Sequence, residues 1–580
     1  MRTYTAPPLD HSEDRTPAIT HAEKCDVLRE HLFPEPPTLD DPPPFDLEPK
    51  EDDMEYVSVT RREVRDAIFT AAQLNAPGIS GLTGRAWRWA WSSLEDEIFH
   101  LIRLCADSGY HPKNWRTSIA VALQKPNRDY AKPRSYRLVQ LLEVLGKTLE
   151  RIQARRLSYF AAKYRLIPSS QYGGIASRSA QDAVISLVHD IEAAWNHDRA
   201  TTMLTFDITG YYDSIPHAHL ISTLRDFHIP LPITKWVYSF VQERQASICL
   251  DGKREALKPV RSGIPQGSCA SPVLAAYFTA PIGEAVTRGT RIRLEAQPEL
   301  SAIINAGKAC ITLLTLYVDN GSISASAHDQ MTSTALVELT FQSAHKWLRS
   351  RGLKVDQAKS DLIHFTKSNR GRHTGNGPAA TIPTNTPGET RSIEPSKLIR
   401  YLGVWLDPKL SFTEHVQKTT SKALAAAHAL RLLGNSIRGM HQTHARRIYI
   451  GAILPIATYG LGTFWKSKSG RILNTMTLMQ NKCLCMIMGA FRTTNVSALE
   501  IEASIPPIEL WMDYRLNMEA LCIARLPADH AILHWIYPDQ RDEDSPPAEP
   551  PSQHTIPANH TNATQGRNSP PASQGSVPEP

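Results

Sequence analysis

Apolar and polar positions along the chain first indicate a long helical region. From Val57 to Leu104, apolar side chains recur every three or four residues, a spacing that is typical of amphipathic helices. Thr60 is followed three residues later by Glu63, which predicts a capping box at the start of a helix. Ala76-Pro77-Gly78 is a stop signal, so that helix is expected to end before residue 76.

Two other segments have the composition and alternation of β-strands. They are residues 202–208 and residues 311–325, and Asn320-Gly321 within the second predicts a hairpin with a type I′ turn. Helices are also expected over residues 138–157 and 180–195. Strands and helices mixed in this order predict an α+β fold.

Proline is concentrated at both ends of the chain. Residues 1–50 hold 10 of the 42 prolines and residues 541–580 hold 9. We therefore predict disordered tails over residues 1–54, which are also acidic, and over residues 531–580. Residues 368–395 are polar and lack periodicity, which predicts a surface loop.

The formal charge of +6 at pH 7 is unevenly distributed. Residues 1–50 carry a net charge of −6 and residues 541–580 one of −3, so the rest of the chain carries +15. Between Lys113 and Leu157, 11 Lys and Arg stand against 3 Asp and Glu. This strip is either the solvated face of a basic helix or a surface that neutralises nucleic-acid phosphates.

Cysteine spacing and the lack of targeting signals argue against several classes of protein. The eight cysteines form no CxxC pair, which argues against a disulfide scaffold or a zinc ribbon. The N-terminus lacks the basic and apolar regions of a signal peptide, so a secreted protein is not expected. Residues 448–465 are uncharged, but Pro455 interrupts them, and we predict a buried helix and turn rather than a membrane span.

Two aspartates follow predicted strands and are candidate metal ligands. Asp207 lies at the end of one strand and Asp319 at the predicted hairpin tip. Each has a simpler explanation, a capping residue or an ordinary hairpin. Together on neighbouring strands they would bridge two metal ions about 3.5–4 Å apart, the arrangement used in phosphoryl transfer. Mg²⁺ is the expected metal because it prefers oxygen ligands and shares them with phosphates.

Between these aspartates lies the segment SGIPQGSCASPVL, residues 262–274, whose glycines and proline predict a rigid turn. The three segments, FDITGYYD, SGIPQGSCASPVL and YVDN, resemble in this order the FDIxGAFD, GxPQGSxxSPxL and YxDD motifs of non-LTR (LINE-type) retrotransposon reverse transcriptases, especially fungal ones. APGISG upstream and YLGVWLDPKLSFTEHV downstream extend the resemblance over about residues 55–525.

The resemblance implies a right-hand polymerase. On this basis residues 55–200 form the fingers, residues 201–367 the palm, and residues 396–530 a primer-grip hairpin and a helical thumb. Members of the family often carry an endonuclease and sometimes an RNase H domain. The segments outside residues 55–530 are too short for either, so neither domain is expected.

The resemblance also implies roles for individual residues. Asp207 and Asp319 hold two Mg²⁺ or Mn²⁺ ions with the Ile208 carbonyl and Asn320, and Lys359 donates a proton to the leaving pyrophosphate. The residues expected to contact the nucleotide are Lys125, Arg137, Tyr212 as the gate against a ribose 2′-hydroxyl, and Gln266. The primer grip is formed by Tyr401, Leu402 and Gly403.

Several positions depart from the family pattern. Asn320 replaces the second Asp of YxDD and removes a negative charge, and Tyr211 replaces a small residue beside the sugar pocket, where a phenol is expected to crowd the nucleotide. Ser80 replaces the Asp of APGxDG, and Leu138 replaces the Pro of YRPI.

These departures leave three functions open. The first is RNA-directed DNA synthesis with an RNA template, a DNA primer and dNTPs as partners, and without a membrane. The second is nucleic-acid binding by a transposon-derived protein without catalysis. The third is RNA-templated RNA synthesis, against which Tyr212 and Tyr317 argue. The sequence leaves open the oligomeric state and whether the protein acts in the nucleus or the cytoplasm.

Overall fold

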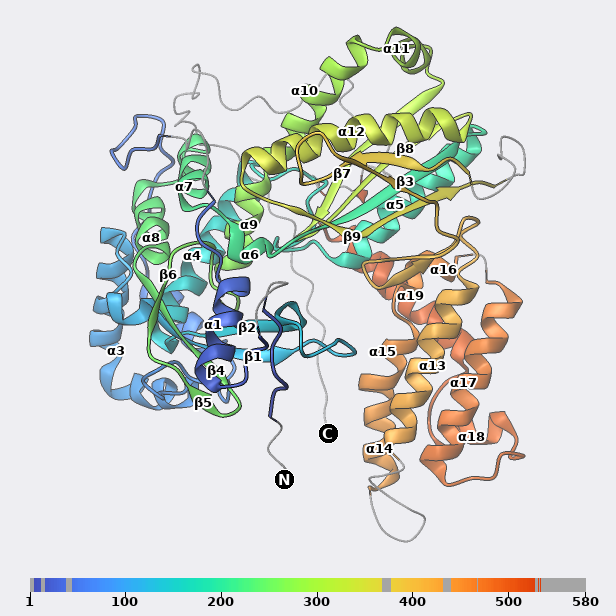
Figure 1. Ribbon diagram of the computed structural model, residues 1–580. Coiled ribbons are helices and arrows are strands. Elements are labelled where there is room, and N and C mark those ends of the chain that lie inside the picture. Colours follow the sequence, from blue (N-terminus) through green and yellow to red (C-terminus); the bar gives the residue numbers. More distant parts are fainter. Residues whose placement is uncertain are drawn as a thin grey trace, which may run out of the picture. The chain divides into compact units, whose positions relative to one another are not determined.

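The computed structural model describes residues 5–11, 16–37, 44–367, 377–430, 440–466, 468–526, 530 and 532–533 (Figure 1). Within them, helices and two larger sheets are mixed along the chain, which confirms the predicted α+β class. The predicted tail over residues 531–580 lies outside the described residues except for residues 532–533.

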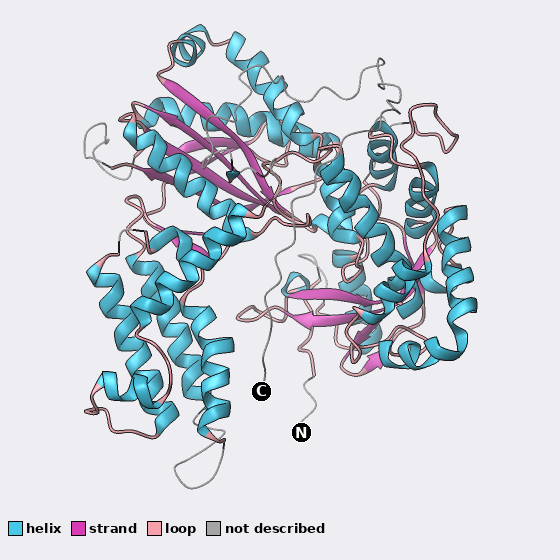
Figure 2. Cartoon of the chain, turned by 180° about the vertical axis from the view of Figure 1, so that it is seen from behind, coloured by secondary structure: helices cyan, strands magenta, loops and turns pink. Residues whose placement is uncertain are grey.

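The first larger sheet has four antiparallel strands in the order β7-β8-β3-β9. Their bounds are β3 (Ala200–Ile208), β7 (Ala309–Tyr317), β8 (Asn320–Ala327) and β9 (Val355–Phe365), so both predicted strand segments are confirmed. Helices α5 (Ala180–Asn196), α10 (Ile282–Glu295), α11 (Pro298–Asn305) and α12 (Gln330–Ser350) lie around this sheet (Figure 2).

Alternate residues of β3 pack into different parts of the core. Phe206 lies against Phe341 of α12, with ring centroids 5.3 Å apart. Met203, of opposite strand parity, packs with Val188 of α5. Because successive side chains of a strand point to opposite faces, β3 is buried on both sides.

The second larger sheet joins strands that are far apart in sequence. Its order is β2-β1-β4-β5, and β6 also pairs with β4. Strands β1 and β4 run parallel, whereas β1 and β2 are antiparallel. The bounds are β1 (Thr117–Gln124), β2 (Tyr136–Leu141), β4 (Arg244–Leu250), β5 (Lys253–Arg254) and β6 (Lys258–Val260).

Helices surround this second sheet and the loops that lead to it (Figure 1). They are α2 (Arg61–Phe69), α3 (Gly84–Ser108), α4 (Val144–Lys163), α6 (Tyr211–Ser214), α7 (His217–Asp226), α8 (Leu231–Val241) and α9 (Ser271–Thr279), with 3-10 turns at Lys113–Arg116 and Pro133–Ser135. The predicted capping box of Thr60 and Glu63 is present at the start of α2, and α2 ends before residue 76.

The helix predicted over residues 138–157 is wrong at its start. Residues 138–141 belong to β2, and α4 begins only at Val144. Tyr136, Leu138 and Gln140 are buried while Arg137 is exposed, so the alternation is that of a strand paired with β1. The pairing partner, which a local pattern does not include, decides the conformation here.

The acidic N-terminal segment is not a disordered tail over its described part. Helix α1 (His21–Leu32) begins with a capping box of Thr20 and Glu23. Val27 and Leu28 of α1 are fully buried and pack with Leu138 and Ile248 of the second sheet. The prolines on either side led to the prediction of disorder, but the segment between them forms a short amphipathic helix. Burial of its apolar side chains against this sheet stabilises the helix.

The predicted surface loop over residues 368–395 is also partly wrong. Residues 368–376 lie outside the described residues, but β10 (Ala380–Pro383) and β11 (Thr390–Ile393) form an antiparallel pair. Ala380 and Ile382 are buried against the core of the four-stranded sheet, which explains why so polar a segment is ordered.

After a small hairpin of β12 (Ile399–Tyr401) and β13 (Val404–Leu406), the rest of the described chain is helical. The helices are α13 (Thr413–Leu430), α14 (Gln442–Ile448), a π-helical turn at Tyr449–Ile453, α15 (Leu454–Ala457), α16 (Leu461–Phe464), α17 (Gly470–Met488), α18 (Val496–Glu502) and α19 (Ile508–Ala524). Residues 448–465 are thus short helices and a turn, as predicted. No helix within the described residues has both the length and the apolar character required to cross a membrane.

Candidate active site

The two candidate metal ligands lie side by side at the ends of paired strands. Asp207 is the penultimate residue of β3 and is paired with Asn320, the first residue of β8. The Ile208 amide donates a hydrogen bond of 2.8 Å to the Asp319 carbonyl oxygen. The two aspartates therefore approach each other because one backbone ladder joins β3 to the hairpin, as the strand pattern predicted.

The hairpin turn is displaced from the predicted position. Tyr317 pairs with Asn320, so the turn consists of Val318 and Asp319 rather than Asn320 and Gly321. Val318 has a φ of +59°, a left-handed conformation that is strained for a β-branched residue. The predicted type I′ turn at Asn-Gly is therefore wrong, although Asp319 does lie in the turn.

Packing rather than turn geometry explains Gly321. A Cβ atom at this position would lie 2.2 Å from the Phe206 ring, which is itself buried. Gly173 has a similar function on the other side of the turn, since a Cβ atom there would lie 2.3 Å from the Val318 nitrogen. The two glycines allow the hairpin to approach β3 and the segment before α5 closely.

Lys359 of β9 contacts the Asp207 carboxylate directly, and its Nζ also lies 3.3 Å from Asp356. Partial burial alone would lower the pKa of Lys359, but the hydrogen bond and the charge of Asp207, together with Asp356, outweigh it and raise the pKa. Burial raises the pKa of Asp319, and the neighbouring Asp207 raises it further. The carboxylates therefore favour a cation beside them.

The oxygens at this site suit a hard divalent ion. Two carboxylates, the Ile208 carbonyl and the Asn320 amide are oxygen donors of the kind that Mg²⁺ prefers. Among the described residues, no group of three or more His, Cys, Asp or Glu side chains has metal-binding geometry. Two carboxylates and two neutral oxygens would fill only part of the shell of a Mg²⁺ ion, and substrate phosphates commonly complete such a shell.

Basic residues from the second sheet lie near these carboxylates. Lys125 follows β1, and its Nζ donates to the Arg134 carbonyl at 2.7 Å. Burial lowers the pKa of Lys125, and the charges of Arg137 and Lys359 lower it further. Since Asp207 also acts on this pKa, strands β1, β3 and β9 bring the sequence-predicted cations and anions to one site.

The loop that contains Gln266 is fixed from two sides. The Gln140 amide of β2 donates to the Gln266 carbonyl at 2.8 Å. Gly267 has a φ of +123°, and a Cβ atom there would lie 2.7 Å from the Gln140 carbonyl oxygen. The exposed backbone of Gly267 is therefore held beside β2, where a ligand can approach it.

Glu150 of α4 holds the other side of this loop and was not identified from the sequence. Its carboxylate accepts hydrogen bonds from Ser268 Oγ at 2.5 Å and from the Cys269 amide at 3.1 Å. Glu150 is fully buried, and burial raises its pKa. The Lys-Thr-Leu-Glu sequence that ends at Glu150 is a local signal, but it does not show which loop Glu150 contacts. That loop lies more than one hundred residues further along the chain.

The adjacent tyrosines 211 and 212 have different environments. Tyr211 is buried, and its hydroxyl donates to the Ala275 carbonyl at 2.8 Å, so the expectation that it crowds a nucleotide is wrong. Its ring fills the core beside α9 instead. Tyr212 is only partly buried, and burial together with the charge of Asp319 raises its pKa to about 12.

The β12–β13 hairpin is attached directly to the hairpin that carries Asp319. Ser322 Oγ of β8 donates to the Tyr401 hydroxyl at 3.0 Å, and both side chains are buried. Leu402 and Gly403 form its turn with φ values of +45° and +92°. Tyr459 donates to the Leu402 carbonyl at 2.8 Å, which fixes the turn from the helical side.

The structure explains one departure from the family pattern and leaves another without a cause. Ser80 donates from its amide and its hydroxyl to the Glu143 carboxylate, at 2.8 and 2.6 Å. An aspartate at position 80 would repel that carboxylate. Leu138 is buried in the core that β2 shares with α1, but proline is apolar as well, and nothing in the structure explains why leucine replaces it.

Comparison with known proteins agrees with this geometry. Residues 123–406 match the family described as reverse transcriptase (RNA-dependent DNA polymerase). The chain is 25% identical over 378 residues to the probable RNA-directed DNA polymerase from transposon BS of Drosophila melanogaster, covering 65% of this chain and 38% of that protein. It is 23% identical over 490 residues to the RNA-directed DNA polymerase from mobile element jockey of the same species, covering 82% of this chain and 50% of that protein.

A third relative is the Pol polyprotein from the type-1 retrotransposable element R1 of Bradysia coprophila, 22% identical over 74% of this chain and 39% of its own length. Among solved structures, apo telomerase from Candida tropicalis aligns with a TM-score of 0.33 and 12% identity over 56% of this chain and 59% of that chain. The chain thus spans half or less of the curated relatives it matches. The family match confirms the predicted right-hand polymerase fold class, and residues 123–406 form a reverse transcriptase domain of the type carried by non-LTR retrotransposons.

Proposed function

We propose that this chain catalyses RNA-directed DNA synthesis, with residues 55–200 as fingers, 201–367 as palm and 396–530 as primer grip and thumb. The observation that carries the proposal is the pairing of Asp207 with the Asp319 hairpin, in direct contact with Lys359. RNA template, DNA primer and dNTPs are the proposed partners. The relatives' printed names describe RNA-directed DNA polymerases, and the retained carboxylates and cations support extending that activity to this chain.

In this proposal Asp207, Asp319, the Ile208 carbonyl and Asn320 hold divalent ions. When bound, Mg²⁺ or Mn²⁺ would activate the primer 3′-hydroxyl and stabilise the negative charge that develops on the phosphates. The residues of the chain itself orient the reactants. Tyr401, Leu402 and Gly403 position the primer end.

The incoming nucleotide would meet side chains from both sheets. Lys125 and Arg137 neutralise its triphosphate, and Gln266 lies over the nucleotide. Tyr212 limits the space beside the sugar and excludes a 2′-hydroxyl. The raised pKa of Lys359 keeps this side chain protonated, as a donor of the proton to pyrophosphate must be.

A second candidate function is nucleic-acid binding without catalysis. Asn320 favours it, because the amide removes one of the negative charges that would hold the metal ions. Primer extension on an RNA template with dNTPs and Mg²⁺ or Mn²⁺ distinguishes the two functions. The full chain is compared with Asp207→Ala and Asn320→Asp.

Incorporation by the natural chain that disappears in Asp207→Ala would support the polymerase. No incorporation by the natural chain, together with incorporation by Asn320→Asp, would indicate a disabled enzyme. If neither the natural chain nor Asn320→Asp incorporates nucleotides, but the natural chain still binds primer–template in an anisotropy assay, the binding function is supported. Incorporation of ribonucleotides in preference to dNTPs would instead indicate RNA synthesis.

A further inference from the structure

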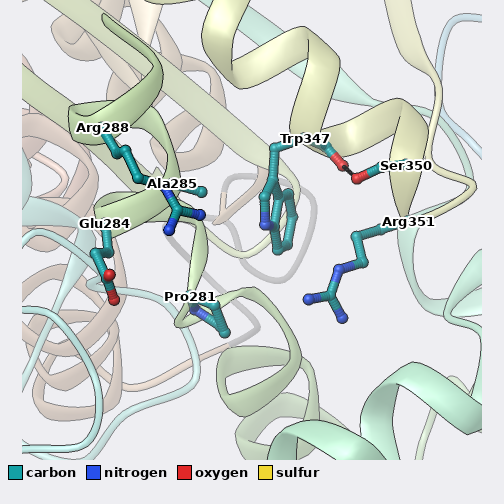
Figure 3. Close-up of a pocket in the computed structure, with 7 residues that line it drawn as sticks. All are labelled: Pro281, Glu284, Ala285, Arg288, Trp347, Ser350 and Arg351. Atoms are coloured by element: carbon teal, nitrogen blue, oxygen red, sulfur yellow. Dashed lines mark hydrogen bonds between the residues drawn. The ribbon is translucent and has the colours of Figure 1, made fainter. Parts of the chain in front are cut away.

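A basic pocket lies between α10 and α12, helices that carry none of the proposed catalytic residues. Its volume is about 240 Å³. Figure 3 shows the side chains of Arg288 and Arg351 on either side of the Trp347 ring. The lining residues are Pro281, Glu284, Ala285, Arg288, Trp347, Ser350 and Arg351.

The charges of the two arginines of this pocket are not neutralised by an ion pair within the described residues. Neither Arg288 nor Arg351 forms an ion pair or a side-chain hydrogen bond with any residue that the structure describes. Partial burial lowers the pKa of Arg351, and Asp226 of α7 opposes this effect without reaching ion-pair distance. An anion in the pocket would stabilise both guanidinium groups.

The wall between the arginines is aromatic and largely buried. Trp347 is only 9% exposed, and its ring packs near Phe278. The Arg351 guanidinium lies over the Trp347 ring, 5.3 Å from the centroid, so a cation–π interaction orients it. Glu284 is the one carboxylate among the lining residues, is exposed, and extends away from Trp347 in Figure 3.

The size of the pocket argues for one group of a larger ligand. Sites that enclose a whole small molecule usually have volumes of about 300–1,000 Å³. This pocket is smaller, and Lys346 of α12, which is exposed, immediately precedes Trp347. A ligand with repeated negative charges would occupy the pocket and contact Lys346 as well.

We propose that the α10–α12 pocket binds a backbone phosphate of a single nucleic-acid strand, as a binding site additional to the catalytic one. Guanidinium groups recognise phosphate oxygens through paired hydrogen bonds, and the net charge of +15 outside the chain ends attracts polyanions. A reverse transcriptase domain handles nucleic acid, which favours this ligand over an acidic peptide. The proposal concerns binding alone and does not depend on catalysis by this chain.

Hydrogen–deuterium exchange of the full chain tests the proposal locally. Oligo-dT without dNTPs or metal is the probe, and the readout is protection of residues 281–295 and 344–353, which the catalytic groove does not include. We compare the natural chain with R288A/R351A and with R291A, a control that removes an exposed arginine of α10 outside the pocket. Arg288 is exposed, so R288E alone supplies a second variant that leaves the core untouched.

We expect oligo-dT to protect both segments in the natural chain and in R291A. The concentration required should rise at least about tenfold in R288A/R351A, and R288E should shift in the same direction. Absence of protection, or equal weakening by R291A, would overturn the proposal, the latter by showing diffuse attraction. Protection by poly-glutamate at lower concentration than oligo-dT, or by inorganic phosphate without protection by oligo-dT, would overturn it in favour of an acidic peptide or a small anion.

Discussion

The Asn320 side-chain nitrogen Nδ2 donates a hydrogen bond of 3.0 Å to Oδ1 of Asp319. The amide therefore stabilises the carboxylate beside it, where an aspartate would repel it. Burial and the charge of Asp207 already raise the pKa of Asp319. Asn320 thus offsets part of the electrostatic repulsion around Asp319, at the expense of attraction for a divalent cation.

The substitution Asn320→Asp is expected to strengthen metal binding. A third negative charge near a divalent ion gains on the order of 1 kcal/mol or more, even in a well-solvated site. We expect the Mg²⁺ concentration for half-maximal primer extension to fall roughly tenfold. The measurement is a Mg²⁺ titration of incorporation, with Asn320→Ala as the matched control, which should require more Mg²⁺ than the natural chain. An unchanged requirement in Asn320→Asp would show that position 320 does not face the metal.

Substitution of Gly321 tests whether this glycine is required for packing against Phe206 rather than for the hairpin turn. Because a Cβ atom would lie 2.2 Å from the buried Phe206 ring, Gly321→Ala should lower the free energy of unfolding by about 1–3 kcal/mol. Chemical denaturation measures this loss. Gly451→Ala is the control, since nothing lies within 4 Å of its Cβ position. Adding Phe206→Leu to Gly321→Ala should make room for the Cβ atom, and we expect it to recover part of the lost stability. If Gly321 were required for a turn instead, the double variant would recover none.

The attachment of the β12–β13 hairpin is tested by its hydroxyl pair. Removing either the Ser322 or the Tyr401 hydroxyl leaves its buried partner without this bond, at a cost of about 1–2 kcal/mol. In the double variant Ser322→Ala/Tyr401→Phe we expect a smaller loss than the sum of the single losses, with a coupling of about 1 kcal/mol. Denaturation of all four chains measures the coupling. Strict additivity would mean that the contact contributes nothing.

Local signals in the sequence were sufficient for much of the site. The apolar runs before Asp207 and Asp319 predicted the strands, and their shared motif order predicted that the two aspartates would meet. The Asn320-Gly321 pair led to the wrong position for the turn because a glycine can be required for either of two reasons. Glycine suits a type I′ turn, but here it makes room for Phe206, which lies more than one hundred residues earlier.

The features that were missed depend on long-range contacts. Residues 138–141 form a strand because β1 pairs with them, and α1 is ordered because the second sheet covers its apolar face. Tyr211 turns into the core because the Ala275 carbonyl accepts its hydroxyl. In each case the partner lies in another element, so periodicity within one segment carries no information about it.

The pH dependence of stability should contain a contribution from Asp190 of α5. Burial raises the pKa of this carboxyl from 3.8 to about 7 in the folded chain. Between these values the folded state holds a proton that the unfolded state has lost, so stability decreases as the pH rises from about 4 to 7. At pH 8 the penalty is at most about 4 kcal/mol.

Asp190→Asn removes this penalty while retaining the size of the side chain. We expect the variant to be more stable than the natural chain at pH 8, by up to a few kcal/mol, and the difference to shrink toward zero near pH 4. Urea denaturation at several pH values measures both chains. Glu192→Gln is the control, because that carboxylate is 43% exposed and pairs with Lys466 at the surface, so its difference from the natural chain should vary little over this range. A constant difference for Asp190→Asn would show that the Asp190 carboxyl titrates normally and that solvent reaches it in the folded protein.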